Sequence, residues 1–135
     1  MNLIIAYIVT TITFLAIDSV WLGVVAKNFY ADKLGNMMLD QPNLKIAAVF
    51  YLFYTIGVVV FAIKPALDAQ NMFLALGYGA LFGFLAYGTY DFTNMATLKN
   101  WPYVMSLVDI VWGTFLTALS AVIGYWLTVT FGKAA

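Results

Sequence analysis

The chain has 135 residues, of which 64% are hydrophobic and only 9% are charged. A soluble domain carries roughly a quarter charged residues, so the composition excludes a soluble enzyme, a nucleic-acid-binding protein and a disordered tail. The six Lys and six Asp give no net charge, and there is no His, Cys, Arg or Glu. Disulfides, imidazole or thiolate metal ligands and the usual general base are therefore excluded, and the sequence predicts an all-α integral membrane protein.

Four apolar stretches are long enough to cross a bilayer as helices, which takes about 20 residues each. They cover residues of about 3–25, 44–63, 72–90 and 102–131 and predict a single four-helix transmembrane domain over 1–135. The first stretch has no basic flank and contains Asp18, which favours a span over a cleavable signal peptide. The last stretch is longer than the hydrocarbon core, so we expect it to tilt or to project from the membrane.

Local signals predict where these helices begin and end. Asn43 and Asn100 are expected to cap the second and fourth spans. The Lys64-Pro65 pair is expected to end the second span, because Pro cannot continue a helix. Aromatic residues near the predicted ends suit the interfacial belt of a membrane protein; they are Tyr30, Trp101, Tyr103 and Trp126.

Four spans place both termini on one side of the membrane. The opposite side, called side X here, holds the loops 26–43 and 93–101. Its lysines are Lys27, Lys33, Lys45 and Lys99, against Lys64 and Lys133 on the side of the termini. Because loops rich in Lys stay in the cytoplasm, side X is expected to be cytoplasmic, with both termini outside.

Asp18, Asp91 and Asp109 lie within or at the end of predicted spans, whereas the other three aspartates fall in loops. Their helix ends meet at side X, so the three carboxyl groups share one leaflet. A charged residue costs about 2.5–3.5 kcal/mol at the centre of a span, and no basic residue lies within the spans to offset it. These groups must be protonated, bind a cation such as Mg²⁺ or Ca²⁺, or accept hydrogen bonds from Tyr and Trp.

Helical spacing places further polar residues beside these acids. Small and polar residues recur every three or four positions from Ser106 to Thr128, which predicts the face of the fourth span that packs into the bundle. Asp18 and Asp109 each begin an Asp-x-x-Trp motif, in which the indole shares a face with the carboxyl group and is able to shield or bond it. The sequence predicts an acidic and aromatic pocket open to side X, formed by Asp18, Trp21, Tyr51, Tyr54, Tyr87, Tyr90, Asp91, Asn94, Asp109 and Trp112. The alternative is that the aspartates only tie helices together through hydrogen bonds.

The segment AYGTYDFTN at 86–94, followed by Trp101-Pro102, is the most specific motif of the chain. Shorter motifs accompany it: Asp18-x-x-Trp21-Leu-Gly23, Phe50-Tyr51, Lys64-Pro65-Ala66-Leu67 and Asp109-x-x-Trp112-Gly113. With these motifs the chain resembles an uncharacterised bacterial family of small predicted membrane proteins over nearly its whole length. The resemblance implies four helices in a bacterial inner membrane; it supplies no catalytic residue and no cofactor.

Three functions fit these observations. The first is binding or modification of a membrane lipid or amphiphile, whose polar part would meet Asp18 and Asp109; the reaction, if there is one, is not assigned. The second is a proton- or cation-coupled transporter acting as a homodimer, because a membrane-embedded acid allows a proton and a substrate to compete. The third is a non-catalytic subunit whose small-residue stripes contact a larger membrane protein.

Overall fold

A computed structural model describes residues 3–40 and 42–132; Lys133, used above in the lysine balance, lies outside them. The first span joins α1 (Leu3–Val20) to the π-helical turn η1 (Trp21–Val25), and a short helix α2 (Phe29–Leu34) and the 3₁₀ turn η2 (Gly35–Met37) follow it. The second span joins α3 (Leu44–Val58), the π-helical turn η3 (Val59–Ile63) and α4 (Lys64–Ala69). Helices α5 (Met72–Thr97) and α6 (Tyr103–Gly132) are the third and fourth spans.

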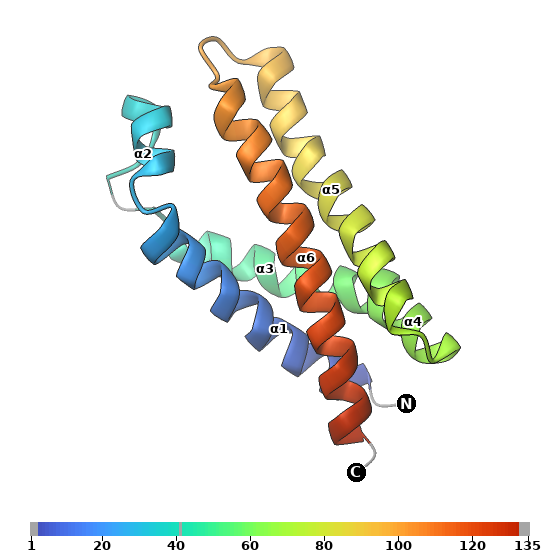
Figure 1. The fold of residues 1–135 in the computed structure, drawn as a ribbon. Helices are drawn as coiled ribbons and strands as arrows, with labels where there is room; N and C mark the ends of the chain where they lie inside the picture. The colour runs from blue at the N-terminus through green and yellow to red at the C-terminus, as the bar shows by residue number, and fades with distance from the viewer. Residues whose placement is uncertain (1–2, 41, 133–135) are drawn as a thin grey trace.

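The four long helices match the predicted fold class. Each is long and apolar enough to cross a membrane, with bounds Leu3–Val25, Leu44–Ala69, Met72–Thr97 and Tyr103–Gly132. No strand occurs in the described part of the chain. Figure 1 shows α2 and the α5–α6 turn at one end of the molecule and both termini at the other. The prediction of an all-α membrane protein with four spans is therefore confirmed.

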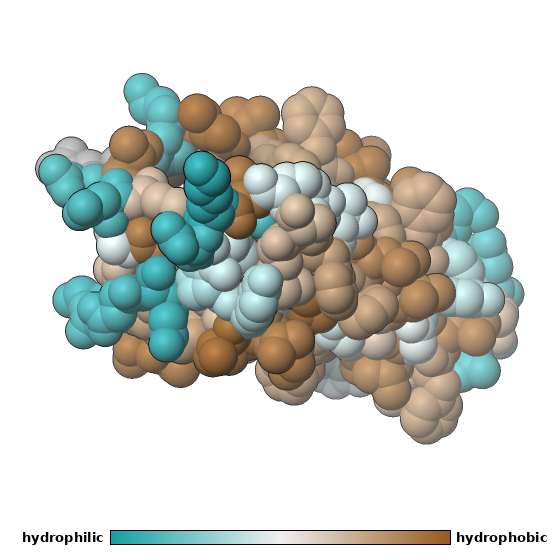
Figure 2. Space-filling model, turned by 90° about the horizontal axis from the view of Figure 1, so that it is seen from above, coloured by the Kyte–Doolittle hydropathy of each residue, from teal (hydrophilic) through white to brown (hydrophobic). Residues whose placement is uncertain are grey.

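The surface and the interior are polarised as a membrane requires. Large apolar side chains such as Ile4, Val24 and Phe73 are exposed, whereas Thr55 and Ser120 are fully buried. Figure 2 shows apolar side chains over most of the visible face and hydrophilic ones gathered toward its two ends. In water this arrangement would be unfavourable, but in lipid the exposed apolar belt has no cost and buried polar groups can join helices.

Close glycine contacts hold the bundle together. Helices α5 and α6 form the most extensive antiparallel pair (Figure 1). A Cβ atom at Gly83 would lie 2.8 Å from Cβ of Thr117, so only glycine lets these backbones approach so closely. The second span meets α5 mainly through η3 and α4. Helices α3 and α5 therefore diverge toward side X and leave space between them.

The helix ends correct several predictions. The Asn43 cap is confirmed, because its Oδ1 accepts a hydrogen bond from the backbone N–H of Ile46 at 3.2 Å. The prediction that Lys64-Pro65 ends the second span is wrong. The helix continues to Ala69, because Pro65 occupies the first turn of α4, where no N–H is needed, directly after the π-helical turn η3.

The third and fourth spans also differ from the expected bounds. Helix α5 continues past Tyr90 to Thr97, so Asp91 lies inside the helix and does not close it. Asn100 does not cap α6, which begins at Tyr103 with a hydrogen bond from the N–H of Ser106 to the carbonyl of Pro102. Asn100 instead adopts a left-handed conformation, with φ of 60°, in the turn between the two helices. Asparagine tolerates this region better than most residues.

Candidate functional site

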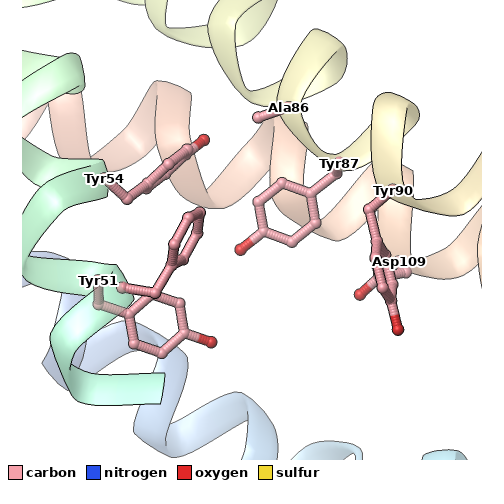
Figure 3. Close-up of a pocket in the computed structure, with 7 residues that line it drawn as sticks. Tyr51, Tyr54, Ala86, Tyr87, Tyr90 and Asp109 are labelled. Carbon is pink, nitrogen blue, oxygen red and sulfur yellow. The ribbon is translucent and has the colours of Figure 1, made fainter. Parts of the chain in front are cut away.

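A cavity of about 370 Å³ lies between α3, α5 and α6, and we call it the tyrosine cavity. Asp109 is the one charged residue in its lining, and aromatic rings form most of its wall. Figure 3 shows the rings projecting from α3 and α5 into the space between these helices. The lining residues are Phe50, Tyr51, Tyr54, Ala86, Tyr87, Tyr90 and Asp109.

Contacts with α6 hold two of the tyrosines in place. The hydroxyl groups of Tyr54 and Thr117 share a hydrogen bond of 2.8 Å. The Tyr87 ring lies directly against Gly113, where any Cβ atom would overlap the ring. The rings of Tyr54 and Tyr87 meet nearly edge to face, at 78° and 6.3 Å between centroids. In Figure 3 the Tyr87 hydroxyl points into the open centre of the cavity. The wall is thus largely pre-formed.

Asp109 is held by a residue that the sequence did not place at the site. The Tyr30 hydroxyl of α2 donates to Oδ1 of Asp109 at 3.0 Å, and the indole N–H of Trp21 donates to the Tyr30 oxygen at 3.1 Å. Burial and the negative charge of Asp109 raise the pKa of the Tyr30 hydroxyl, so it stays protonated and able to donate. Tyr30 was expected only in the interfacial belt, because nothing in the local sequence shows that its side chain reaches Asp109 on α6.

The two Asp-x-x-Trp motifs bond crosswise. The indole N–H of Trp112 donates to Oδ1 of Asp18 at 3.2 Å. The indole N–H of Trp21 donates to the Tyr30 hydroxyl, which in turn donates to Asp109. The two indoles stack at 10° with centroids 4.3 Å apart. Of the two roles expected for each indole, shielding or bonding the carboxyl group of its own motif, bonding does not occur, because both indole N–H groups donate elsewhere. The stack turns each indole toward the facing helix, so the motifs join α1 to α6.

Asp18 connects this indole stack to the tyrosine cavity. Its side chain is buried in α1 and interacts with Tyr51, which lines the cavity from α3. The stack, Tyr30 and Asp18 therefore lie beside the cavity and fix the side chains that enter it.

Asp91 belongs to a separate buried network. It is 0% exposed and accepts a hydrogen bond from the Ser106 hydroxyl at 3.2 Å, and Ser106 accepts one from the Trp101 indole at 2.7 Å. Oδ2 of Asp91 has no hydrogen-bond partner among the described residues, although the Asp109 carboxyl lies near enough to interact with it. Trp101 is only 9% exposed, so its predicted place in the interfacial belt is wrong.

The ten predicted pocket residues thus fall into three groups. Tyr51, Tyr54, Tyr87, Tyr90 and Asp109 line the cavity. The second group, Asp18, Trp21 and Trp112, forms the adjoining stack and its hydrogen bonds. The third, Asp91 and Asn94, does not line the cavity, and Asn94 lies beside Tyr90 on α5. Phe50 and Ala86 line the cavity but were not predicted to, although each belongs to a motif noted above.

The three membrane-embedded aspartates do not form a metal site together. Among the described residues no group of three carboxylates is close enough to hold a metal ion. The possibility, left open by the sequence, that Asp18, Asp91 and Asp109 share an Mg²⁺ or Ca²⁺ ion has no support in this arrangement of the described residues. Each carboxyl group instead has its own side-chain donor: Trp112 at Asp18, Tyr30 at Asp109 and Ser106 at Asp91.

These features define a four-helix integral membrane protein with a polar interior. The chain belongs to the family described as "Predicted membrane protein (DUF2177)", whose model matches residues 3–126. The resemblance noted from the motifs is therefore confirmed at the level of the family. No curated protein and no solved structure matches the chain.

Proposed function

We propose that the protein binds a membrane amphiphile in the tyrosine cavity. The polar part of the ligand meets Asp109, and its apolar chain lies between α3 and α5 in contact with lipid. The observation that carries this proposal is a single carboxyl group set in an aromatic cavity between two diverging helices. Ligand sites are typically concave, mostly apolar and equipped with a few placed polar groups.

The rim of the cavity supports access from the membrane. Phe50 on α3 is 61% exposed and Tyr90 on α5 is 55% exposed, although both line the cavity. In a bilayer these exposed rings face acyl chains, so a lipid-soluble ligand can enter sideways without crossing the head-group layer. Tyr30 covers Asp109 from α2, and this favours lateral access over access through α2.

Native mass spectrometry of the gently solubilised protein tests this proposal. We expect a co-purifying small molecule in the wild type that is lost in Asp109→Asn and in Ala86→Phe, which fills the cavity. Two matched controls should retain it: Asp32→Asn in α2, and Ala96→Phe, a solvent- or lipid-exposed position on the same helix as Ala86.

Other outcomes would favour the other functions. A ligand retained by Ala86→Phe would contradict binding in this cavity. An empty homodimer, unchanged by Asp109→Asn, would favour a cation-coupled transporter. An empty monomer would favour a non-catalytic subunit of a larger membrane assembly.

We also propose that side X faces the cytoplasm of a bacterial cell, with both termini outside. The lysine count supports this orientation, because four of the six lysines of the chain lie on side X. Because the chain has no Cys, a single introduced cysteine shows on which side of the membrane its position lies. A membrane-impermeant maleimide should label Gln70→Cys, and leave Asp32→Cys unlabelled until the cells are permeabilised. The reverse pattern would contradict the orientation.

A further inference from the structure

Among the described residues, neither Asp18 nor Asp109 forms an ion pair. In the described part of the chain the one ion pair joins Lys64 to Asp68, at the end of the second span away from the cavity. Asp18 and Asp109 receive hydrogen bonds from the neutral donors Trp112 and Tyr30 instead. Neutral donors stabilise a carboxylate but leave its charge in place, so a ligand that supplies a positive charge would be favoured.

We propose that the ligand of the tyrosine cavity carries an ammonium group; this inference rests on the proposed function. Five of the seven lining residues are aromatic and one is a carboxylate. The faces of tyrosine and phenylalanine rings attract cations, and rings arranged around a carboxylate recognise ammonium groups in particular. The cavity therefore combines the two features that hold an ammonium ion.

The geometry of the rings fits a small cation. Tyr54 and Tyr87 stand nearly perpendicular, and Phe50 lies beside Tyr54 at 6.1 Å and 26°. These rings form adjacent walls, with Asp109 in the same lining. A volume of about 370 Å³ accommodates a head group and the start of an acyl chain.

The same lining disfavours an anionic head group. None of the described lysines lines the cavity, and the chain contains no Arg. A phosphate or carboxylate in the cavity would be repelled by Asp109 and would leave its own oxygens without a cationic partner. Both a primary ammonium, which can donate to tyrosine hydroxyls, and a trimethylammonium, which contacts only ring faces and the carboxylate, remain compatible with the lining.

The test compares amphiphiles that share a twelve-carbon chain and differ only in the head group. Binding of dodecylammonium, dodecyltrimethylammonium, dodecanol and dodecanoate to the full chain in a neutral maltoside detergent is followed by tryptophan fluorescence and native mass spectrometry. Trp21 and Trp112 lie next to the cavity and serve as reporters. We expect at least one ammonium amphiphile to bind about thirtyfold tighter than dodecanol, which corresponds to the strength of a desolvated cation–π contact.

Variants of the lining distinguish the loss of a binding contact from the loss of the fold. Asp109→Asn should remove the preference for ammonium over dodecanol, whereas Asp32→Asn should keep it. Tyr87→Leu should lose most of the preference, because it removes one of the ring faces that contact the cation. Circular dichroism confirms that each variant keeps its helices.

The outcomes distinguish the two proposals. If dodecanol or dodecanoate binds as tightly as the ammonium amphiphiles and Ala86→Phe abolishes that binding, the amphiphile function holds and the ammonium inference is overturned. If no amphiphile binds, both are overturned. A preference between the two ammonium amphiphiles shows whether the site takes a primary or a quaternary head group.

Discussion

Replacing Ser106 by alanine should destabilise the fold measurably. The Ser106 hydroxyl accepts from the Trp101 indole at 2.7 Å and donates to Asp91 at 3.2 Å. Both partners are buried, and the other oxygen of Asp91 already has no partner among the described residues. Ser106→Ala therefore removes two hydrogen bonds and leaves the whole Asp91 carboxyl group without a hydrogen-bond donor in that part of the chain.

The expected loss follows from these two bonds. Hydrogen bonds between helices in membranes contribute about 0.6 kcal/mol on average and up to about 1.7 kcal/mol each. An unsatisfied buried group adds to this cost. We expect Ser106→Ala to lower the free energy of unfolding by about 1–3 kcal/mol.

Ser120→Ala is the matched control. Ser120 lies on the same helix and is fully buried, but its hydroxyl has no hydrogen-bond partner among the described residues. Removing this hydroxyl should leave the free energy of unfolding unchanged or raise it by up to about 1 kcal/mol.

Reversible unfolding in mixed detergent micelles with increasing dodecyl sulfate, followed by far-ultraviolet circular dichroism, measures both variants. A double-mutant cycle with Trp101→Phe should give a coupling energy of about 0.6–1.7 kcal/mol for the indole–hydroxyl bond. Equal stability of Ser106→Ala and Ser120→Ala would refute the Asp91 network.

Three further predictions concern other parts of the fold. Gly113→Ala should push the Tyr87 ring aside and lower the free energy of unfolding by about 1–3 kcal/mol, seen as a lower thermal midpoint; an unchanged midpoint would contradict the close α5–α6 contact. The folded state raises the pKa of Tyr30 above its ordinary value of about 10, so this residue stabilises the fold below pH 10 and loses that contribution as the pH rises further. The free energy of unfolding of Tyr30→Phe should therefore fall less than that of the wild type between neutral pH and pH 11. If the free energies of both proteins fall in parallel with pH, Tyr30 does not contribute to stability through its raised pKa. Lys64→Ala should change the free energy of unfolding by less than about 0.5 kcal/mol, because its ion pair with Asp68 is half exposed; a larger loss would show that the pair is more than a surface contact.

Composition and hydropathy were enough to predict the class of this protein. An apolar stretch of about 20 residues has few options besides a membrane helix, and capping residues such as Asn43 act through their immediate neighbours. Topology alone also placed the helix ends that carry Asp18 and Asp109 on one side, because alternate helix ends meet at the same face of the membrane. These results depend on local or one-dimensional properties of the chain.

The partners of each acid were decided by the tertiary structure. Helical periodicity shows which residues share a face, as Asp18 and Trp21 do, but it does not show how that face is rotated against its neighbours. The rotation depends on close contacts such as Gly113 against Tyr87, and the π-helical turns change the register of the first two spans. The crosswise indole bonds therefore appear only once the helices have packed, as does the reach of Tyr30 from α2 to Asp109.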